Sequence, residues 1–577
     1  MDEYVTLVRM AEGRFVRVPV GHRADQWTTV GLERSVLLVS HNVTTITRLL
    51  DVIDLFDSDF RVQVVISFSG TDPFSGDLDE LFAKVGMVAV PWAQALRMRF
   101  DLAIAASHHG GLADIDAPLV ILAHGVGFSK LVSPGVPKGI GGESAVAHAF
   151  GLSPQWVLYD SRPVAAALVL SHPEQLDRLS VAAPAAAPSA VVAGDPTYDR
   201  MLASVGLRQR YRRELGVDDG RTVVMLSTTW SRNSLLGSDP GIFKRLLAEL
   251  PLDSYRVVAA LHPNVWQGHG SWQLRSWLAD CLRSGLILVP PLEGWRAALI
   301  AADCVIGDHG SVTCYGAALG KPVLLGAFPE DEVAPGSAVD MLGRIAARVS
   351  PHEPLRNQVN RAIVDHSVDH YGPVSELVTS LPGETASRLR SLFYQLLRLS
   401  EPDGEVLTRV IPTAGLPGAG ALQRVSAVLA GVELNASTRT LVITRFPAEL
   451  HQFGVIDRRI SAPHFVVHIH HPQARLKKSA AILTIDESEL CEAPSKWLAE
   501  TLDSYPECWL SAVAGDARVL LQARTGQRVE LSGGDEIVRF VSVVYCWLVL
   551  GCPLGDLGPS IKVDMGTRQY DLRIRTM

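Results

Sequence analysis

Short apolar runs alternate with helical stretches from residue 35 to residue 325, and this alternation limits the fold more than any other feature. The apolar runs lie at 35–40, 62–68, 89–91, 102–106 and 119–123 in the first half, and at 222–227, 256–261, 286–289, 304–306 and 323–325 in the second. Buried strands separated by helices form mostly parallel sheets that are covered on both faces. We therefore predict two doubly wound α/β domains that face each other across a cleft.

The chain is too long for a single hydrophobic core, because its 577 residues exceed the usual size of one domain. A low-complexity stretch rich in Ala and Pro at 182–190 is predicted to connect the first two domains, and Gly and Pro at 404–420 indicate a second linker. The predicted domains are 1–190, 191–400 and 401–577. A short hairpin within 4–20, helices at 45–56, 78–85 and 272–284, and a final helix of the second domain at 386–399 are also expected.

Composition argues against several classes of protein. A net charge of −8 and a pI near 6.1, without a basic tract, argue against a dedicated nucleic-acid binder. The seven cysteines are scattered without a C-x-x-C pair, which predicts neither a disulfide framework nor a zinc cluster and suits a reducing cytoplasm. The first residues do not resemble a signal peptide, and the apolar run 540–554 is shorter than the ~20 residues of a spanning helix. Any membrane contact is therefore predicted to be peripheral.

A βαβ unit at 301–325 carries the clearest candidate binding site. An apolar strand ends at the polar turn 307–311, and a helix of small residues then runs to Leu319. The N-terminus of a helix carries about half a positive charge, so Gly310, Ser311 and Val312 are predicted to bind an anion such as a diphosphate. The alternative is an ordinary turn in which Asp308 or Ser311 only caps the helix.

Polar residues follow several of the predicted strands, where ligands gather in parallel sheets. Histidine stands at three of these strand ends in the first half, as His41, His108 and His124, and Asn42 and Lys130 lie nearby in sequence. Imidazole titrates near neutrality and can accept a proton from an alcohol. The alternative is that each histidine is a hydrogen-bonded loop residue without a catalytic role.

Motifs in the second half resemble those of the CDP-glycerol glycerophosphotransferases, the teichoic-acid primases and polymerases of the GT-B superfamily. The resemblance spans roughly residues 30–400 and rests on these residues: Gly194, Pro196, Asp199, Ser227 to Arg232, His262, Pro263, Ala302, Asp303, Ile306, Asp308, Ser311 and Gly320 to Pro322. It implies two Rossmann-like domains. It also implies transfer of a glycerophosphate or glycosyl group from a CDP-glycerol-like nucleotide donor to a hydroxyl acceptor, lipid-linked acceptors included, in cell-envelope or surface-polymer synthesis.

The resemblance also implies roles for individual residues. His124, followed by Gly125 as in the family's turn that carries its proposed base, is expected to deprotonate the acceptor, and His262 to donate to a phosphoryl oxygen. Asp308 is expected to orient His262 or the acceptor. The donor is expected to contact Ser227, Thr228, Arg232, His262, Gly310, Ser311 and Val312, and the acceptor side His41, Asn42, His108 and Lys130. Neither a metal nor another cofactor is implied.

Departures from the family pattern leave other functions open. The family's Asp-Tyr-Ser-Ser turn is Asp308-His-Gly-Ser311 here, and Cys314 and Tyr315 stand where an acidic residue is expected. The turn after His124 continues as Val-Gly instead of Thr-Pro. The alternatives are a UDP-sugar glycosyltransferase or 2-epimerase-like enzyme and a non-catalytic nucleotide-binding scaffold.

The third domain is predicted to be α+β, with a role in acceptor recognition or homo-oligomer formation. Its His468 and His470 alternate with apolar residues, so they are expected to line one face of a sheet. The pairs His108-His109 and His470-His471 cannot share a strand face, and no carboxylate stands at a convincing ligand spacing from either pair. No metal site is therefore predicted.

Overall fold

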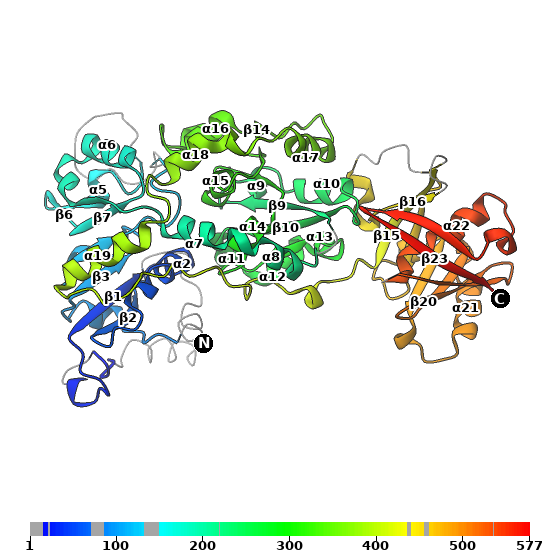
Figure 1. Ribbon diagram of the computed structural model, residues 1–577, viewed down its shortest axis with the longest axis horizontal. Helices are drawn as coiled ribbons and strands as arrows, with labels where there is room; N and C mark the ends of the chain where they lie inside the picture. Colours follow the sequence, from blue (N-terminus) through cyan, green and yellow to red (C-terminus); the bar gives the residue numbers. More distant parts are fainter. Residues whose placement is uncertain are drawn as a thin grey trace, which may run out of the picture.

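The computed structural model describes residues 15–20, 24–70, 86–131, 149–217, 220–435, 440–454, 461–534 and 536–577. Two parallel sheets and a closed barrel follow one another along the long axis of the molecule (Figure 1). The predicted helix 78–85 and most of the predicted hairpin 4–20 lie outside the described residues. Residues 15–20 form a turn and irregular chain instead of a strand.

The first sheet has six parallel strands in the order β2-β1-β3-β4-β7-β8. They are β1 (Arg34–Ser40), β2 (Val62–Phe68), β3 (Leu102–Ala105), β4 (Leu119–Ile121), β7 (Ala167–Leu170) and β8 (Ala190–Val192). Along β1, Val36 and Leu38 enter one core while Leu37 and Val39 enter the core on the opposite face. This two-sided burial explains why the strand is apolar throughout. The predicted run 89–91 contributes only one bridge, from Ala89 to Ile66, at the outer side of β2.

The helices of the first domain cover both faces of its sheet. They are η1 (Ala24–Gln26), α2 (Val43–Leu50), η2 (Ile53–Phe56), α4 (Trp92–Ala95), η3 (Leu112–Asp114), α5 (Pro154–Val157), α6 (Pro173–Ala182) and η4 (Pro184–Ser189), with a small hairpin of β5 (Leu158–Tyr159) and β6 (Arg162–Pro163). The predicted helix 45–56 is thus two elements, α2 and η2. Asn42 begins α2 with a capping box, in which its side chain accepts from the Thr45 N–H.

The second sheet is also parallel and six-stranded, in the order β11-β10-β9-β12-β13-β14. Its strands are β9 (Thr222–Thr228), β10 (Tyr255–Leu261), β11 (Ile287–Val289), β12 (Cys304–Gly307), β13 (Val323–Leu325) and β14 (Ala347–Arg348). Numbered by chain order within the sheet, this is 3-2-1-4-5-6, the Rossmann order. If the single bridge at Ala89 is counted as a strand, the first sheet begins with the same order and has one strand more, 3-2-1-4-5-6-7. The prediction of two doubly wound domains is confirmed.

The second domain is completed by helices on both faces of its sheet. They are α7 (Pro196–Ser204), η5 (Val205–Leu207), α8 (Arg208–Glu214), α9 (Leu235–Ser238), α10 (Ile242–Glu249), α11 (Pro263–His269), α12 (Ser271–Trp277), α13 (Ala279–Arg283), α14 (Trp295–Ala301), α15 (Ser311–Ala318), η6 (Glu330–Glu332), α16 (Ala338–Ile345), α17 (Leu355–Val364), η7 (Val368–Tyr371) and α18 (Gly372–Val378). The predicted helix 272–284 is divided at Leu278 into α12 and α13.

The chain returns to the first domain through α19 (Thr385–Leu397), which packs beside η2 and β3 (Figure 1). The ring of Phe393 stacks on Phe56 with 5.7 Å between the centroids. Asp199 of the Gly-x-Pro-x-x-Asp motif accepts hydrogen bonds from the N–H groups of Gly383 (2.7 Å) and Thr385 (2.9 Å), which fixes the start of this helix. The helix predicted at 386–399 therefore crosses between the two domains.

The predicted connector 182–190 forms part of the first domain. Its Pro and Ala residues form the helix η4, and β8, which follows at once, pairs with β7 in the first sheet. β8 lies at the predicted boundary between the first two domains, and it completes the first sheet because the apolar residues 190–192 fill the open edge beside β7.

The third domain is a closed barrel of nine strands, which corrects the prediction of a simple α+β domain. Its strands, in spatial order, are β15 (Ala427–Asn435), β16 (Thr440–Pro447), β22 (Ser560–Met565), β23 (Arg568–Thr576), β21 (Arg528–Ser532), β20 (Arg518–Ala523), β19 (Leu510–Ala514), β18 (Ile482–Asp486) and β17 (His464–His468). The helices are η8 (Ala419–Ala421), η9 (Ala448–Phe453), α20 (Ala474–Lys478), η10 (Glu487–Glu489), α21 (Pro494–Ser504), η11 (Ile537–Phe540), α22 (Ser542–Val549) and η12 (Leu554–Leu557).

A buried ion pair joins the barrel to the second domain. Arg445 on β16 donates to both carboxylate oxygens of Asp253, at 2.6 and 2.9 Å. Burial alone would raise the pKa of Asp253, but Arg445 beside it keeps the pKa below its ordinary value.

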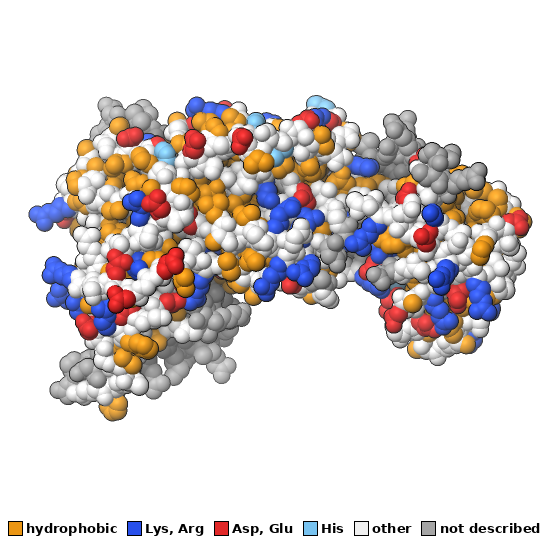
Figure 2. All heavy atoms as spheres, in the orientation of Figure 1, with side chains coloured by type: hydrophobic (Ala, Val, Ile, Leu, Met, Phe, Trp, Pro, Cys, Tyr) orange, Lys and Arg blue, Asp and Glu red, His pale blue; other side chains and the backbone are white. Residues whose placement is uncertain are grey.

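On the described part of the face in Figure 2, basic and acidic side chains are interspersed. None of the helices in the described ranges combines the length and apolar character needed to traverse a bilayer.

Candidate functional site

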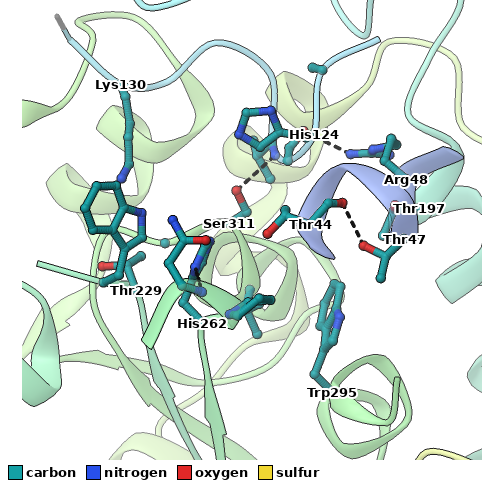
Figure 3. Close-up of a pocket in the computed structure, with 18 of the residues that line it drawn as sticks. Thr44, Thr47, Arg48, His124, Lys130, Thr197, Thr229, His262, Trp295 and Ser311 are labelled. Atoms are coloured by element: carbon teal, nitrogen blue, oxygen red, sulfur yellow. Dashed lines mark hydrogen bonds between the residues drawn. The ribbon is translucent and has the colours of Figure 1, made fainter. Parts of the chain in front are cut away.

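A cavity of about 390 Å³ lies between the two parallel-sheet domains. Its walls come from the loops that follow β3 and β4 in the first domain and β9, β10 and β12 in the second (Figure 3). In parallel sheets the ligand crevice lies beyond the carboxyl ends of the strands, where the strand order reverses. In the second domain that point lies between β9 and β12, so the cavity occupies the position that the topology favours.

His124 contributes the first-domain side of the cavity. Its Nδ1 lies 3.0 Å from the carbonyl oxygen of Ala106, which can only accept, so Nδ1 carries the ring proton. The accessible part of the ring faces the cavity. Desolvation by the surrounding protein lowers the pKa of the ring to about 4. The imidazole is therefore neutral at pH 7, and Nε2 keeps a lone pair that can accept a proton.

His262 has the opposite tautomer and lies on the second-domain side. It begins α11, and its Nδ1 accepts the N–H of Asn264 at 3.1 Å. Burial, with smaller contributions from nearby Lys130 and His124, lowers its pKa to about 3, so the ring is neutral and its proton lies on Nε2. One histidine of the cavity is thus set to accept a proton and the other to donate a hydrogen bond.

The N-terminus of α15 borders the cavity at Gly310, Ser311 and Val312. The first N–H groups of a helix have no acceptor within the helix, so they can bind an anion. The Ser311 hydroxyl oxygen accepts the Val126 N–H at 3.1 Å and keeps its own proton for another acceptor. A Cβ on Gly310 would lie 2.5 Å from Cγ2 of Thr229, so this position has no room for a side chain beside Thr229.

Asp308 differs from its expected role. It is fully buried, does not line the cavity, and accepts hydrogen bonds from the N–H groups of Thr229 (2.7 Å), Leu235 (2.9 Å) and Gly310 (3.0 Å). The hydroxyl of Thr229 donates to it as well, at 3.0 Å. The carboxylate therefore holds the loops after β9 and β12 together, and none of these hydrogen bonds involves His262.

The other predicted residues divide between the cavity and its surroundings. Asn42, His108, Lys130, Ser227 and Thr228 line the cavity, whereas His41 and Arg232 do not. His41 is buried behind the wall, where its Nε2 donates to the carbonyl oxygen of His109 at 2.6 Å. The Arg232 side chain is exposed to solvent. The predicted convergence of three histidines is thus wrong for His41 and holds for His108 and His124.

A buried network at the far end of the cavity was missed by the sequence reasoning. The Arg48 guanidinium pairs with Asp195 at 2.8 Å and donates to the Tyr315 hydroxyl at 3.1 Å. Tyr315 in turn donates to Asp195 at 2.7 Å. Elements from both domains meet here, and no spacing in the sequence relates them. Trp295 and Arg296 also line this end, and the only available signal was the Pro290-Pro291 turn that precedes them after β11.

No protein-family model and no curated protein matches this chain. Solved structures do match it, at low sequence identity. The wall teichoic acid polymerase TagF aligns with 64% of this chain and 90% of its own, at 12% identity and a TM-score of 0.43. Anabaena HepE in complex with UDP-glucose aligns with 63% of this chain and 98% of its own, at 13% identity and a TM-score of 0.36. The HepE complex with UDP gives 14% identity and a TM-score of 0.38, over 63% of this chain and 100% of that one.

Proposed function

We propose that the protein is a GT-B-type transferase that moves a glycerophosphate or glycosyl group from a nucleotide diphosphate donor to a hydroxyl acceptor. One observation carries the proposal. His124, a neutral histidine that can accept a proton, lines the same cavity as His262, a histidine that can donate a hydrogen bond, and as the N-terminus of α15 at Ser311 (Figure 3). This is the complement that a hydroxyl nucleophile and an anionic leaving group require.

The chemistry of each group follows from its protonation state. Nε2 of His124 takes the proton of the acceptor hydroxyl while its oxygen attacks the phosphorus or the sugar carbon of the donor. The bond to the nucleotide oxygen breaks with its electron pair, so a nucleoside monophosphate leaves in glycerophosphate transfer and a nucleoside diphosphate leaves in glycosyl transfer. The negative charge of the leaving group is stabilised by Nε2–H of His262, the Ser311 hydroxyl and the N-terminus of α15. Lys130, which faces the cavity above the Trp230 ring at 5.4 Å, supplies a cation.

A second function, a nucleotide-binding scaffold without turnover, is favoured by α15 itself. Cys314 and Tyr315 are buried on this helix where the family resemblance led us to expect an acidic residue, and the Tyr315 hydroxyl is already bonded to Asp195. The helix α15 therefore supplies no carboxylate to a donor. The same feature argues against the 2-epimerase-like reading.

A ligand screen separates these functions. A ligand that binds only the folded state stabilises it by about 2.7 kcal/mol at 100 times its Kd, so CDP-glycerol, CDP-ribitol and UDP-sugars are compared by thermal unfolding at equal concentration. The transferase proposal expects stabilisation by one donor and its turnover with a hydroxyl acceptor. Stabilisation without turnover for any acceptor class supports the scaffold. No stabilisation by any nucleotide contradicts both.

A further inference from the structure

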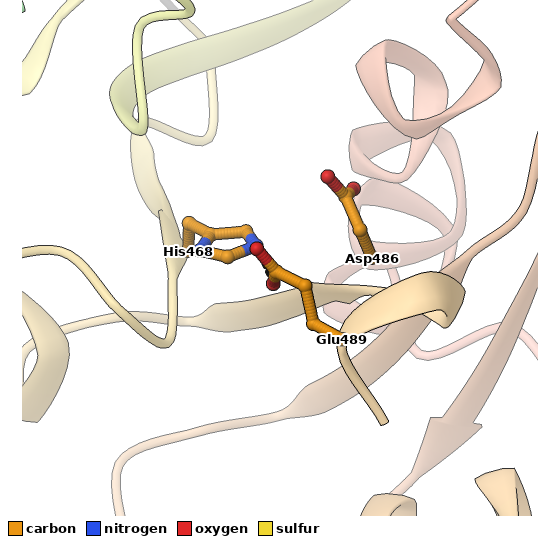
Figure 4. A group of neighbouring side chains, drawn as sticks. All are labelled: His468, Asp486 and Glu489. Atoms are coloured by element: carbon orange, nitrogen blue, oxygen red, sulfur yellow. Dashed lines mark ion pairs between the residues drawn. The ribbon is translucent and has the colours of Figure 1, made fainter. Parts of the chain in front are cut away.

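A group of potential metal ligands lies in the barrel, far from the cavity in sequence. His468 is the last residue of β17, Asp486 is the last residue of β18, and Glu489 ends η10 (Figure 4). Strands β17 and β18 are parallel neighbours, so their carboxyl ends bring the imidazole and the carboxylates to the same edge of the barrel. One ligand atom from each of the three residues lies within 4.8 Å of the others.

The distances fit the coordination of a small cation. Nε2 of His468 lies 3.2 Å from a carboxylate oxygen of Glu489. Zinc binds nitrogen and oxygen ligands at about 2.0–2.2 Å, so two ligands of a tetrahedral ion stand about 3.3–3.5 Å apart. The Nε2 atom is buried and makes no hydrogen bond among the described residues. Nε2 of His468 and the carboxylate oxygen of Glu489 therefore already stand at about the separation of two ligand atoms on one zinc ion.

A fourth ligand is within reach on the exposed side of the group. Nε2 of His470 lies 3.9 Å from the same oxygen of Glu489, and its side chain is 65% exposed and can rotate. The neighbouring His471 is engaged elsewhere, because its Nδ1 bonds the Ser426 hydroxyl at 2.8 Å and its Nε2 lies 3.6 Å from Glu449. His468 and His470 thus face Glu489, whereas His471 faces Glu449.

Two contacts must yield when a cation binds. Arg424 lies 3.3 Å from Asp486, but its side chain is 64% exposed and can move into solvent. Nδ1 of His468 faces the His470 N–H at 3.4 Å, a weak contact that is lost when the ring proton moves to Nδ1. Neither contact is buried deeply enough to prevent binding.

We propose that His468, Asp486 and Glu489, with His470 as a fourth ligand, form a binding site for a divalent transition-metal ion of the zinc class. Imidazole together with carboxylates suits Zn²⁺, whereas Mg²⁺ and Ca²⁺ prefer sites made of oxygen alone. The ion joins the ends of β17 and β18 to η10 and stabilises this edge of the barrel.

Titration of the full chain with Zn²⁺ after dialysis against a chelator tests the site. The wild type is expected to bind one equivalent by calorimetry and to unfold at a higher temperature with Zn²⁺, but not with Mg²⁺. H468N and E489Q are expected to lose at least tenfold in affinity and most of the thermal shift. H352N and E500Q, which replace exposed residues elsewhere, serve as matched controls and should behave like the wild type.

The fold of each variant is checked by circular dichroism before titration. Co²⁺ absorption gives a second measurement, since the visible bands of a bound ion should appear in the wild type and the controls but not in H468N. Equal Zn²⁺ affinity in wild type, H468N and E489Q would overturn the proposal, as would the absence of saturable binding to the wild type.

Discussion

The hydroxyl oxygen of Ser311 on α15 accepts a hydrogen bond of 3.1 Å from the backbone N–H of Val126 in the opposite domain. This contact joins the two domains beside the proposed donor site. It also requires a glycine at position 125, because a Cβ there would lie 2.5 Å from Oγ of Ser311. The N-terminus of α15 nevertheless still borders the cavity at Gly310, Ser311 and Val312.

Replacement of Ser311 by Ala should weaken nucleotide binding. The variant loses the acceptor for Val126 and the hydroxyl that faces the donor, and each hydrogen bond contributes about 0.5–1.5 kcal/mol. Loss of the one hydrogen bond to the donor should raise the Kd of the stabilising nucleotide about 2- to 13-fold, measured by calorimetry. S387A, on the exposed face of α19, is the matched control. An unchanged Kd in S311A would remove Ser311 from the donor site.

Replacement of Gly310 by Ser, the residue of the family turn, should destabilise this protein. The new Cβ would clash with Cγ2 of Thr229, and overpacking of this kind costs about 1–3 kcal/mol. The backbone of Gly310, with φ −80°, adds no strain of its own. T229S removes the clashing methyl group and keeps the hydroxyl, so the double variant should recover most of the loss in denaturant unfolding. A double variant as unstable as G310S would show that the clash is not the cause.

His124→Ala should abolish transfer while nucleotide binding persists, because the general base is lost but the donor contacts remain. The neutral form of His124 is the active one, and its pKa is lowered to about 4. We therefore expect kcat/KM of the wild type to stay level from pH 8 to about pH 5 and to fall only nearer pH 4. A wild-type rate in H124A, or an acid limb in the wild type near pH 6.5, would contradict the base assignment.

Acid should destabilise the folded protein through His108 and His262. Burial lowers the pKa of both rings to about 3, so they are neutral in the folded state and take up protons on unfolding below pH 6.5. The free energy of unfolding should thus decrease as the pH falls from about 6.5 towards 4, by at most about 1.4 kcal/mol per pH unit for each ring. Denaturant unfolding at several pH values measures the slope, which should be smaller in H108Q. An equal slope in H108Q would refute this account.

Asp308→Asn should reduce stability more than it alters the chemical step. An amide offers one acceptor oxygen and places an NH₂ group against N–H donors, so the loops after β9 and β12 lose several hydrogen bonds, at about 1–3 kcal/mol for each buried group left unpaired. Urea unfolding should show a loss of several kcal/mol. If D308N keeps the stability of the wild type and loses only kcat, the carboxylate acts in catalysis instead.

Much of the fold was predictable because burial on both faces of a sheet leaves a continuous apolar run in the sequence. The run 62–68 was predicted with the bounds that the structure gives. The barrel was not predicted, because its closure depends on pairings such as β15 with β17 and β21 with β23, which no local pattern encodes. Likewise β8 joined the first sheet because β7 offered an open edge.

By itself the sequence determined the two doubly wound domains and the residue types at the strand ends, because periodicity and turn chemistry are local properties. Only the tertiary structure decided which of those residues meet. It placed His124 and His262 in one cavity and turned His41 and Asp308 into buried hydrogen-bonding partners of the loops. It also joined Arg48, Asp195 and Tyr315, because contacts between elements far apart in the chain depend on packing and not on sequence spacing.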